Sequence, residues 1–283
     1  MVRTGYEESN MALVEITIPA DETVELVLEY GGLPQDWNLM TVQQGDPEIS
    51  AEYLCLENQT LAPYLLNVAG EGEPIPAQIE ITLPAHMTAL PFGAQQAEVV
   101  RENADGTVTW RCAGAGPGGI LYAGDYVRQD VQAGGITVQL YYSRKHEAIM
   151  QQADAAGVVE AVVEYCTAHY GALSFGSAGT LKLIQGRVRG GGYAAAGASL
   201  LDEADFTATN LADGQKGAVP GEVMLHELVH QWWGLGNMFD VETADSPWSA
   251  EGLTVYTTYR IVKELYGEDY AQEHYVDQWQ KAV

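Results

Sequence analysis

The sequence predicts an α+β protein in which an N-terminal antiparallel β-sandwich domain precedes a helix-rich domain. Short runs of alternating apolar and polar residues, separated by turn residues, fill the first half of the chain. Apolar residues at helical spacing dominate the second half, and a length of 283 residues suits two domains. Acidic charge is also divided unevenly, with 20 acidic and 4 basic side chains in residues 1–140 against 19 and 9 in residues 141–283.

The N-terminal half carries period-two alternation that predicts strands. We expect them at residues 13–18, 24–30, 79–83, 99–101, 108–111 and 136–142. Asn103-Ala104-Asp105-Gly106 lies between two of these runs and predicts a hairpin turn. Short strands separated by turns at this spacing are typical of an antiparallel sandwich.

The C-terminal half changes to the helical period near residue 146. We expect a helix over residues 146–170, a strand at 180–185, and helices at about 219–234, 247–266 and 267–281. The glycine-containing run at residues 132–135 is the predicted boundary, which gives domains of residues 1–133 and 134–283. A glycine-rich stretch at 190–197 indicates either a tight turn or an edge strand that a peptide backbone can approach closely.

Composition excludes several functional classes. The formal net charge of −26 disfavours partners with a phosphate backbone and anionic membrane surfaces, so no nucleic-acid partner is expected. No apolar run is long enough to span a membrane within this chain. Three widely separated cysteines, Cys55, Cys112 and Cys166, favour buried free thiols over a disulfide framework.

The motif His226-Glu227-Leu228-Val229-His230 carries the most specific chemical signal. Residues four apart lie on one face of a helix, so both imidazoles can reach a single ion. Zinc accepts imidazole nitrogens, and Glu227 can take a proton from a water that the metal activates. The motif therefore predicts one Zn²⁺ ion at His226 and His230, with Glu227 as general base. The competing interpretation is a helix with two structural histidines.

A catalytic zinc site needs a third protein ligand, and the downstream candidates are Asp240, Glu242, Asp245 and Glu251. Glu251 is favoured because it lies among apolar residues at helical spacing. These are Trp248, Val255, Tyr259, Val262 and Tyr266. An acid within an apolar stripe is costly unless a partner offsets its charge, and a metal ion would do so. The alternative is an acid at the edge of a groove or paired with an arginine.

The segments 226–234 and 248–253 together resemble the aminopeptidase N-like family of zinc metallopeptidases, gluzincins of the membrane alanyl aminopeptidase type. Residues 76–84 and 124–126 are similar to parts of that family's N-terminal β-domain. The resemblance implies a thermolysin-like catalytic domain with His226, His230 and Glu251 as zinc ligands and Glu227 as general base. It further implies that this chain is a truncated fragment of an extracytoplasmic or membrane-attached parent, ending before the family's transition-state tyrosine.

Two departures from the family pattern matter for function. Twenty residues separate His230 from Glu251, two more than the family usually has, and a longer loop before the ligand helix accommodates them. The family's Gly-x-Met-Glu-Asn motif, whose Glu grips the free amine of the substrate, aligns best with residues 191–195. The predicted substrate-binding residues are therefore Gly191, Gly192, Tyr193 and Ala194, with the anionic anchor missing at Ala194. Acids at residues 202 and 203 are candidates to replace it.

The leading hypothesis is an aminopeptidase-like zinc metallopeptidase that hydrolyses peptide bonds, with weak or no activity in this fragment alone. The first alternative is a catalytically impaired, zinc-containing peptide-binding or adaptor module. A second alternative, a β-rich surface interaction module, leaves the His-Glu-x-x-His motif unexplained. The intact Glu227 favours the enzyme, whereas the uncharged Ala194 favours the adaptor.

Overall fold

The computed structural model describes most of the chain from residue 48 onward and two short strands before it. The described residues are 2–4, 12–14, alternate residues from 25 to 31, 48–57, 78–93, 95–113, 120–173, 179–187, 191–203, 222–235 and 248–282. They fall into two units, residues 1–33 and 34–283. In the first unit, β1 (Val2–Thr4) pairs with β2 (Ala12–Val14) in antiparallel fashion. The rest of the strand predicted at 13–18 and half of the one at 24–30 lie outside the described residues.

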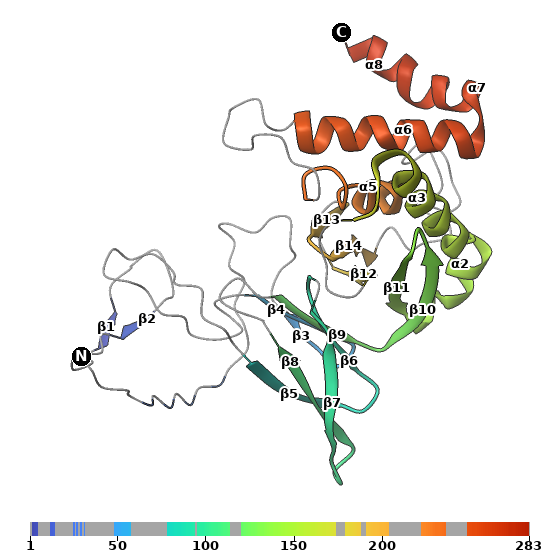
Figure 1. Cartoon of the computed structure of the whole chain (residues 1–283). Helices are drawn as coiled ribbons and strands as arrows, with labels where there is room; N and C mark the ends of the chain where they lie inside the picture. The colour runs from blue at the N-terminus through green and yellow to red at the C-terminus, as the bar shows by residue number, and fades with distance from the viewer. Residues whose placement is uncertain are drawn as a thin grey trace. The chain divides into compact units, whose positions relative to one another are not determined.

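The second unit begins with two antiparallel sheets (Figure 1). The first, in the order β3-β4-β9-β6, consists of Glu48–Ile49, Tyr53–Glu57, Ile120–Gly124 and Thr88–Pro91. The second, in the order β5-β8-β7, consists of Gln78–Pro84, Thr107–Ala113 and Ala97–Glu102. Buried side chains from both sheets form one cluster, among them Leu54, Leu83, Cys112 and Leu121. The predicted sandwich, its hairpin at residues 103–106 and the α+β class are confirmed.

A mixed five-stranded sheet follows in the order β10-β11-β12-β14-β13. Its strands are Tyr126–Ala133, Ile136–Ser143, Thr180–Gly186, Ala198–Asp202 and Gly192–Ala195. Strands β11, β12 and β14 run parallel, whereas the outer strands β10 and β13 are antiparallel to their neighbours. The predicted domain boundary after residue 133 coincides with the turn of the β10–β11 hairpin. A boundary that keeps this hairpin within one sheet would lie at Asp125, between β9 and β10.

Helices pack against this sheet. The helix predicted over 146–170 is interrupted, because α2 (Glu147–Gln152) and α3 (Ala155–Tyr170) meet at Asp154, which has a left-handed φ of 49°. The Asp154 side chain accepts a hydrogen bond from the Gly157 N–H, which caps the second helix. A short 3₁₀ turn, η1 (Arg144–His146), precedes them. Within the described part of the chain, no helix combines the length and apolar character needed to cross a membrane.

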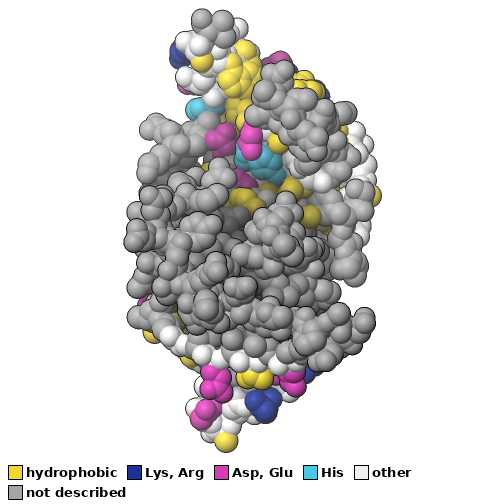
Figure 2. Space-filling model, turned by 90° about the vertical axis from the view of Figure 1, so that its left-hand side faces the viewer, with side chains coloured by type: hydrophobic (Ala, Val, Ile, Leu, Met, Phe, Trp, Pro, Cys, Tyr) yellow, Lys and Arg dark blue, Asp and Glu magenta, His cyan; other side chains and the backbone are white. Residues whose placement is uncertain are grey.

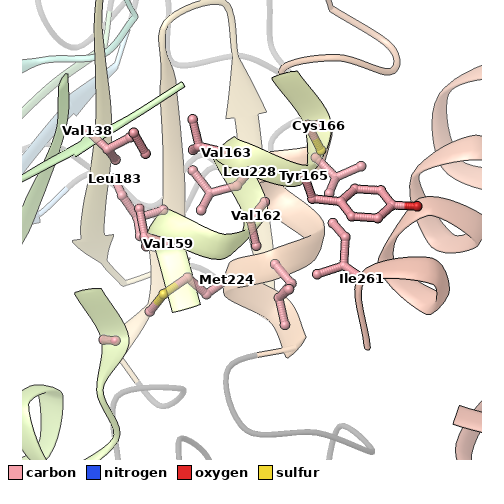
Figure 3. Close-up of a cluster of buried hydrophobic side chains, with 14 of the residues drawn as sticks. Val138, Val159, Val162, Val163, Tyr165, Cys166, Leu183, Met224, Leu228 and Ile261 are labelled. Atoms are coloured by element: carbon pink, nitrogen blue, oxygen red, sulfur yellow. The ribbon is translucent and has the colours of Figure 1, made fainter. Parts of the chain in front are cut away.

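The C-terminal helices carry the chemical motifs. They are α5 (Glu222–Val229), the π-helical turn η4 (Trp248–Gly252), α6 (Leu253–Tyr266), α7 (Glu268–Ala271), the π-helical turn η5 (Gln272–Val276) and α8 (Asp277–Ala282). The inner faces of α3, α5 and α6 meet the mixed sheet in one apolar core, where Val159 and Val162 of α3 pack with Leu228 of α5 and Leu183 of β12 (Figure 3). This core fixes α5 against β13 and β14, the strands beside the histidine motif.

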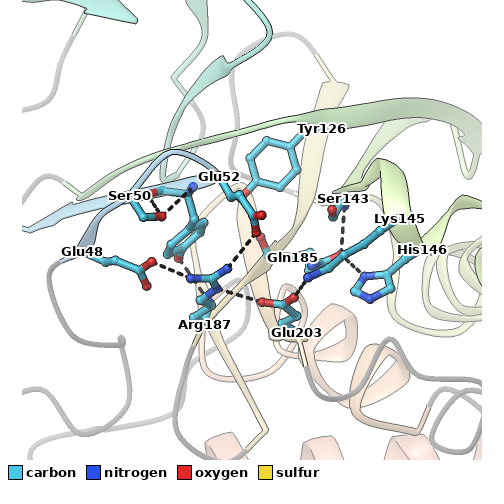
Figure 4. Close-up of polar contacts among 11 residues, drawn as sticks. Glu48, Ser50, Glu52, Tyr126, Ser143, Lys145, His146, Gln185, Arg187 and Glu203 are labelled. Atoms are coloured by element: carbon cyan, nitrogen blue, oxygen red, sulfur yellow. Dashed lines mark hydrogen bonds and ion pairs between the residues drawn. The ribbon is translucent and has the colours of Figure 1, made fainter. Parts of the chain in front are cut away.

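A polar network joins the mixed sheet to the first antiparallel sheet (Figure 4). Arg187, which follows β12, donates to Glu48 of β3 at 2.5 Å and to Glu203, which follows β14, at 2.8 Å. Its guanidinium carbon lies 5.1 Å from the ring centroid of Tyr53 on β4, and Lys145 donates a second hydrogen bond to Glu203. Because one guanidinium has two carboxylate acceptors and one aromatic ring as partners, on three different segments, it ties the two sheets together.

Lys182 makes a second connection between the same two regions. Its side chain is 1% exposed on β12, and its Nζ donates to the backbone carbonyls of Pro91 and Gln95. Burial lowers the pKa of Lys182 to about 7, and the nearby Cys112 thiol offsets part of that effect. A neutral amine retains the two hydrogens that the two carbonyls require.

Lys182 should consequently contribute stability that rises with pH. Between about pH 7 and about pH 10, the unfolded chain binds a proton at Lys182 that the folded chain does not, so this group increases the free energy of unfolding with pH. The slope from this group is at most about 1.4 kcal/mol per pH unit. Urea unfolding between pH 7.5 and 9.5 should give a slope in the wild type and in the surface control Lys263→Met that exceeds the slope in Lys182→Met by up to this amount. The comparison is needed because burial raises the pKa of the Cys112 and Cys166 thiols, which contribute the opposite slope in all three proteins. An equal slope in all three proteins would contradict the assignment.

Candidate active site

Helix α5 presents its polar residues on one face and buries the other. Met224, Leu225, Leu228 and Val229 are buried in the apolar core. The polar stripe at residues 222, 226 and 230 faces a cavity instead. The hydrophobic pattern of the motif thus determines the rotation of α5 about its own axis. This rotation places both imidazoles on the side that faces the cavity.

The three predicted metal ligands converge in space. His226 Nε2 and His230 Nε2 lie 3.0 Å apart, and Glu251 on η4 places one oxygen 3.3 Å from His226 Nε2 and the other 3.5 Å from His230 Nε2. Zinc bonds of about 2.0–2.2 Å at tetrahedral angles separate neighbouring ligand atoms by roughly 3.4 Å. The nitrogens are 3.0 Å apart, and each lies within 3.5 Å of a different Glu251 oxygen, so the two imidazoles and the carboxylate are close enough to hold one metal ion.

Local electrostatics favour a cation at this position. Hydrogen bonding with His226 and His230 holds the pKa of Glu251 far below its usual range, so its carboxylate is ionised. Burial alone would lower the pKa of His230, but its hydrogen bond with Glu251 and the charge of Glu227 outweigh burial and raise it. The imidazoles therefore face fixed negative charge, and a metal ion competes with protons for their nitrogens.

The second nitrogen of His230 is held by neighbouring groups. His230 Nδ1 lies 3.2 Å from the backbone oxygen of Trp233 and 3.2 Å from Thr254 Oγ1 on α6. An Nδ1–H that donates to the Trp233 carbonyl leaves the Nε2 lone pair free for a metal. This arrangement supports the tautomer that a ligand requires and ties the orientation of the ring to α6.

Glu227 lies against the backbone of the edge strand. Its side chain is 6% exposed, and a β-carbon at Gly192 would lie 2.5 Å from Glu227 Cδ and 2.6 Å from its Oε1. Only glycine can therefore occupy position 192 while Glu227 keeps this position. Gly192 thus allows the close approach of Glu227, and β13 is an edge strand, as one of the two sequence interpretations predicted. The approach of a peptide backbone to this strand stays a prediction.

A cavity of about 560 Å³ opens over these groups. In the space-filling view, histidine and acidic side chains lie beside one another on this face (Figure 2). All four residues predicted to bind substrate line the cavity, together with the motif side chains. The lining consists of Gly191, Gly192, Tyr193, Ala194, Glu222, Val223, His226, Glu227, His230, Gly234, Leu235, Ala250 and Glu251.

Sequence reasoning missed one acid in this wall. Glu222 lies one helical turn before His226, and Tyr275 of η5 donates a hydrogen bond to it. Burial raises the pKa of Glu222, although Tyr275 and His226 partly counter that effect. The i, i+4 spacing of residues 222, 226 and 230 was the available signal.

Other candidate acids do not line the cavity. Glu203 is engaged by Arg187 and Lys145, and Asp202 is likewise absent from the cavity wall. The alternative ligands Asp240, Glu242 and Asp245 lie outside the described residues.

The chain shares its fold with solved M1 zinc metallopeptidases. An enzyme from Deinococcus radiodurans is 18% identical, with a TM-score of 0.52 over 88% of this chain and 55% of that chain. A mutant from the same organism, bound to a Tyr-Ser-Ala substrate, is 19% identical, with a TM-score of 0.51 over 88% and 54%. A two-domain M1 mutant bound to L-tryptophan is 20% identical, with a TM-score of 0.51 over 84% and 54%.

This chain spans little more than half the length of those structures, and at these identities the likeness establishes the fold. No family model matches the sequence, and no curated protein matches it either.

Metal content tests the ligand geometry directly. We expect one zinc ion per chain by mass-spectrometric metal analysis, and no stoichiometric zinc in His226→Ala or His230→Ala, because each variant leaves only two protein ligands. His86→Ala, which removes a histidine in an exposed contact of the β-sandwich, should retain the ion. Zinc at 100 times its Kd should raise the free energy of unfolding by about 2.7 kcal/mol. Stoichiometric zinc in a variant that carries both His226→Ala and His230→Ala would refute this ligand set.

Proposed function

We propose that the chain is the metal-binding part of a zinc metallopeptidase that hydrolyses peptide bonds, with an aminopeptidase-like architecture. The observation that carries the proposal is the convergence of two imidazoles and one carboxylate within 3.5 Å of one another, with a second, buried carboxylate beside them. Two histidines and one glutamate are the ligand set of a known class of catalytic zinc site. The M1 peptidase fold supports the same conclusion.

His226, His230 and Glu251 are the proposed zinc ligands. When bound, the zinc ion would supply a Lewis acid that polarises the peptide carbonyl and lowers the pKa of the attacking water. The hydrogen bond of His230 to Trp233 keeps its ring oriented, and the position of Glu251 on η4 brings the third ligand to α5 from another helix.

Glu227 is the proposed general base. Its neighbour on α5 is a ligand, and its carboxylate lies at the cavity wall beside Gly192, so it can accept a proton from the attacking water. The free edge of β13 is the proposed site for the substrate backbone, because an edge strand offers unpaired N–H and C=O groups to an extended peptide. Gly191, Gly192, Tyr193 and Ala194 form that surface.

A second candidate function rests on Ala194. Because a methyl group stands where the family's amine-anchoring glutamate is expected, a zinc-containing module that binds peptides without cleaving them is the alternative. The buried Glu227 favours the peptidase, since a binding module has no use for a desolvated carboxylate at its metal site.

Replacement of Glu227 separates these functions. Glu227→Gln should retain one zinc ion per chain but reduce tripeptide hydrolysis by about 10²- to 10⁴-fold, because the proton acceptor is lost while the ligands remain. Hydrolysis is followed by mass spectrometry, with the exposed α3 variant Glu160→Gln as the matched control. Tripeptide cleavage by the zinc-loaded wild type that is lost in Glu227→Gln would favour the peptidase over the binding module. Equal turnover in wild type and Glu227→Gln would rule out Glu227 as the base.

A further inference from the structure

Gln231 directly follows the second histidine and is fully buried. Its Oε1 accepts the Gly197 N–H at 3.0 Å, and its Nε2 donates to the carbonyls of Ala195 at 3.0 Å and Ala198 at 3.2 Å. Both amide hydrogens and the oxygen therefore contact the β13–β14 turn. A primary amide supplies two N–H donors and one acceptor oxygen, which matches the two carbonyls and one N–H that it meets here.

Ser199 on β14 extends the same contact. Its hydroxyl donates to the backbone oxygen of Glu227 at 2.7 Å and lies 3.2 Å from Gln231 Nε2. Further along β13, the missing side chain of Gly192 lets Glu227 lie against the strand backbone. The β13–β14 hairpin thus contacts α5 beside the proposed base, and it contacts Gln231 in the turn that follows α5.

Strand β13 needs such support. It has four residues and, among the described residues, pairs only with β14, so this pairing fixes one of its edges. Short edge strands with few partners open at low free-energy cost. Tyr193 packs against Phe92 on one side of β13, and contacts from α5 and Gln231 on the other side help to set the distance between this strand and the imidazoles.

We propose that Gln231 is a positioning residue. It fixes the distance of β13, and thus of a substrate backbone bound along β13, from the side chains of Glu227 and His230. The proposal rests on the proposed function, because it assumes that the substrate lies along β13. According to this proposal, loss of the Gln231 amide alters the placement of the substrate but not the binding of the metal. His230 is oriented by Trp233 and Thr254 and not by the Gln231 side chain, so the zinc site does not depend on that amide.

The test compares two buried glutamines of the same sheet region. Gln231→Met keeps the side-chain length and removes both donors and the acceptor. Gln139→Met makes the same change on β11, where Gln139 is 7% exposed and accepts from Tyr141, away from the cavity. Three quantities are measured in each protein: zinc stoichiometry, hydrogen exchange of the amides of residues 191–199, and the Kd for a tripeptide.

We expect Gln231→Met to keep one zinc ion, to exchange the amides of residues 191–199 at least tenfold faster, and to bind the tripeptide at least tenfold more weakly. A displacement of about 1 Å at an active site can cost 10²-fold in rate, so a tenfold loss of affinity is a modest threshold. Gln139→Met should match wild type in exchange of residues 191–199 and in tripeptide affinity. Unchanged exchange and affinity in Gln231→Met, or loss of its zinc, would overturn the proposal.

Ser199→Ala covers the case in which Gln231→Met does not fold. It removes one hydroxyl from the same contact and should shift exchange and affinity in the same direction by a smaller factor, again with zinc retained; no shift would count against the proposal. Failure of the proposed function has a different signature. Wild-type chain that carries zinc but neither binds nor cleaves peptides would contradict the peptidase, whereas the exchange rates of residues 191–199 would still decide the role of Gln231.

Discussion

The candidate site depends on the seating of α5 between the mixed sheet and α6. One face of this short helix is buried in the core, and its opposite face carries the ligands, the proposed base and Glu222. Burying an apolar face of this kind contributes about 25 cal/mol per Å² of area removed from water, which outweighs any single polar contact of the helix. Burial of its leucines, valine and methionine thus fixes the rotation of α5 about its axis. The polar residues consequently face the cavity. Loss of core packing would disperse the site even with every ligand intact.

Much of the site could be predicted because its signals are local. The i, i+4 spacing of His226 and His230 is a property of one helix, and the structure brings their nitrogens to 3.0 Å. Glu251 lies close to both histidines, as the sequence predicts, but its surroundings differ from the predicted ones. It was expected within an apolar stripe, yet 61% of its side chain and 57% of Trp248 are exposed. The acid lies at the rim of the helix packing, where the two imidazoles offset its charge.

The remainder depends on contacts between distant segments, which single-sequence patterns do not encode. Strand β10 was not predicted, although it pairs along its whole length with β11. Its charged residues Arg128 and Asp130 hide the alternation, and they pair with each other on the exposed face. The break at Asp154 was missed because the apolar period continues through it. The roles of Gln231 and Gly192 are set by segments more than thirty residues apart in the chain, so no local pattern could reveal them.

The Arg187 network also has a consequence for the order of folding. Glu48 and Arg187 are 139 residues apart, and Tyr53 lies nearly as far from the same guanidinium. At about 5–20 residues per second, a ribosome would release β3 and β4 roughly 7–28 s before Arg187 emerges. During that interval the first sheet lacks its charge partner, and the edges of its short strands are open to other chains. The acidic, lysine-free composition of residues 1–140 supplies mutual repulsion in this window, which would keep nascent chains apart until the mixed sheet arrives.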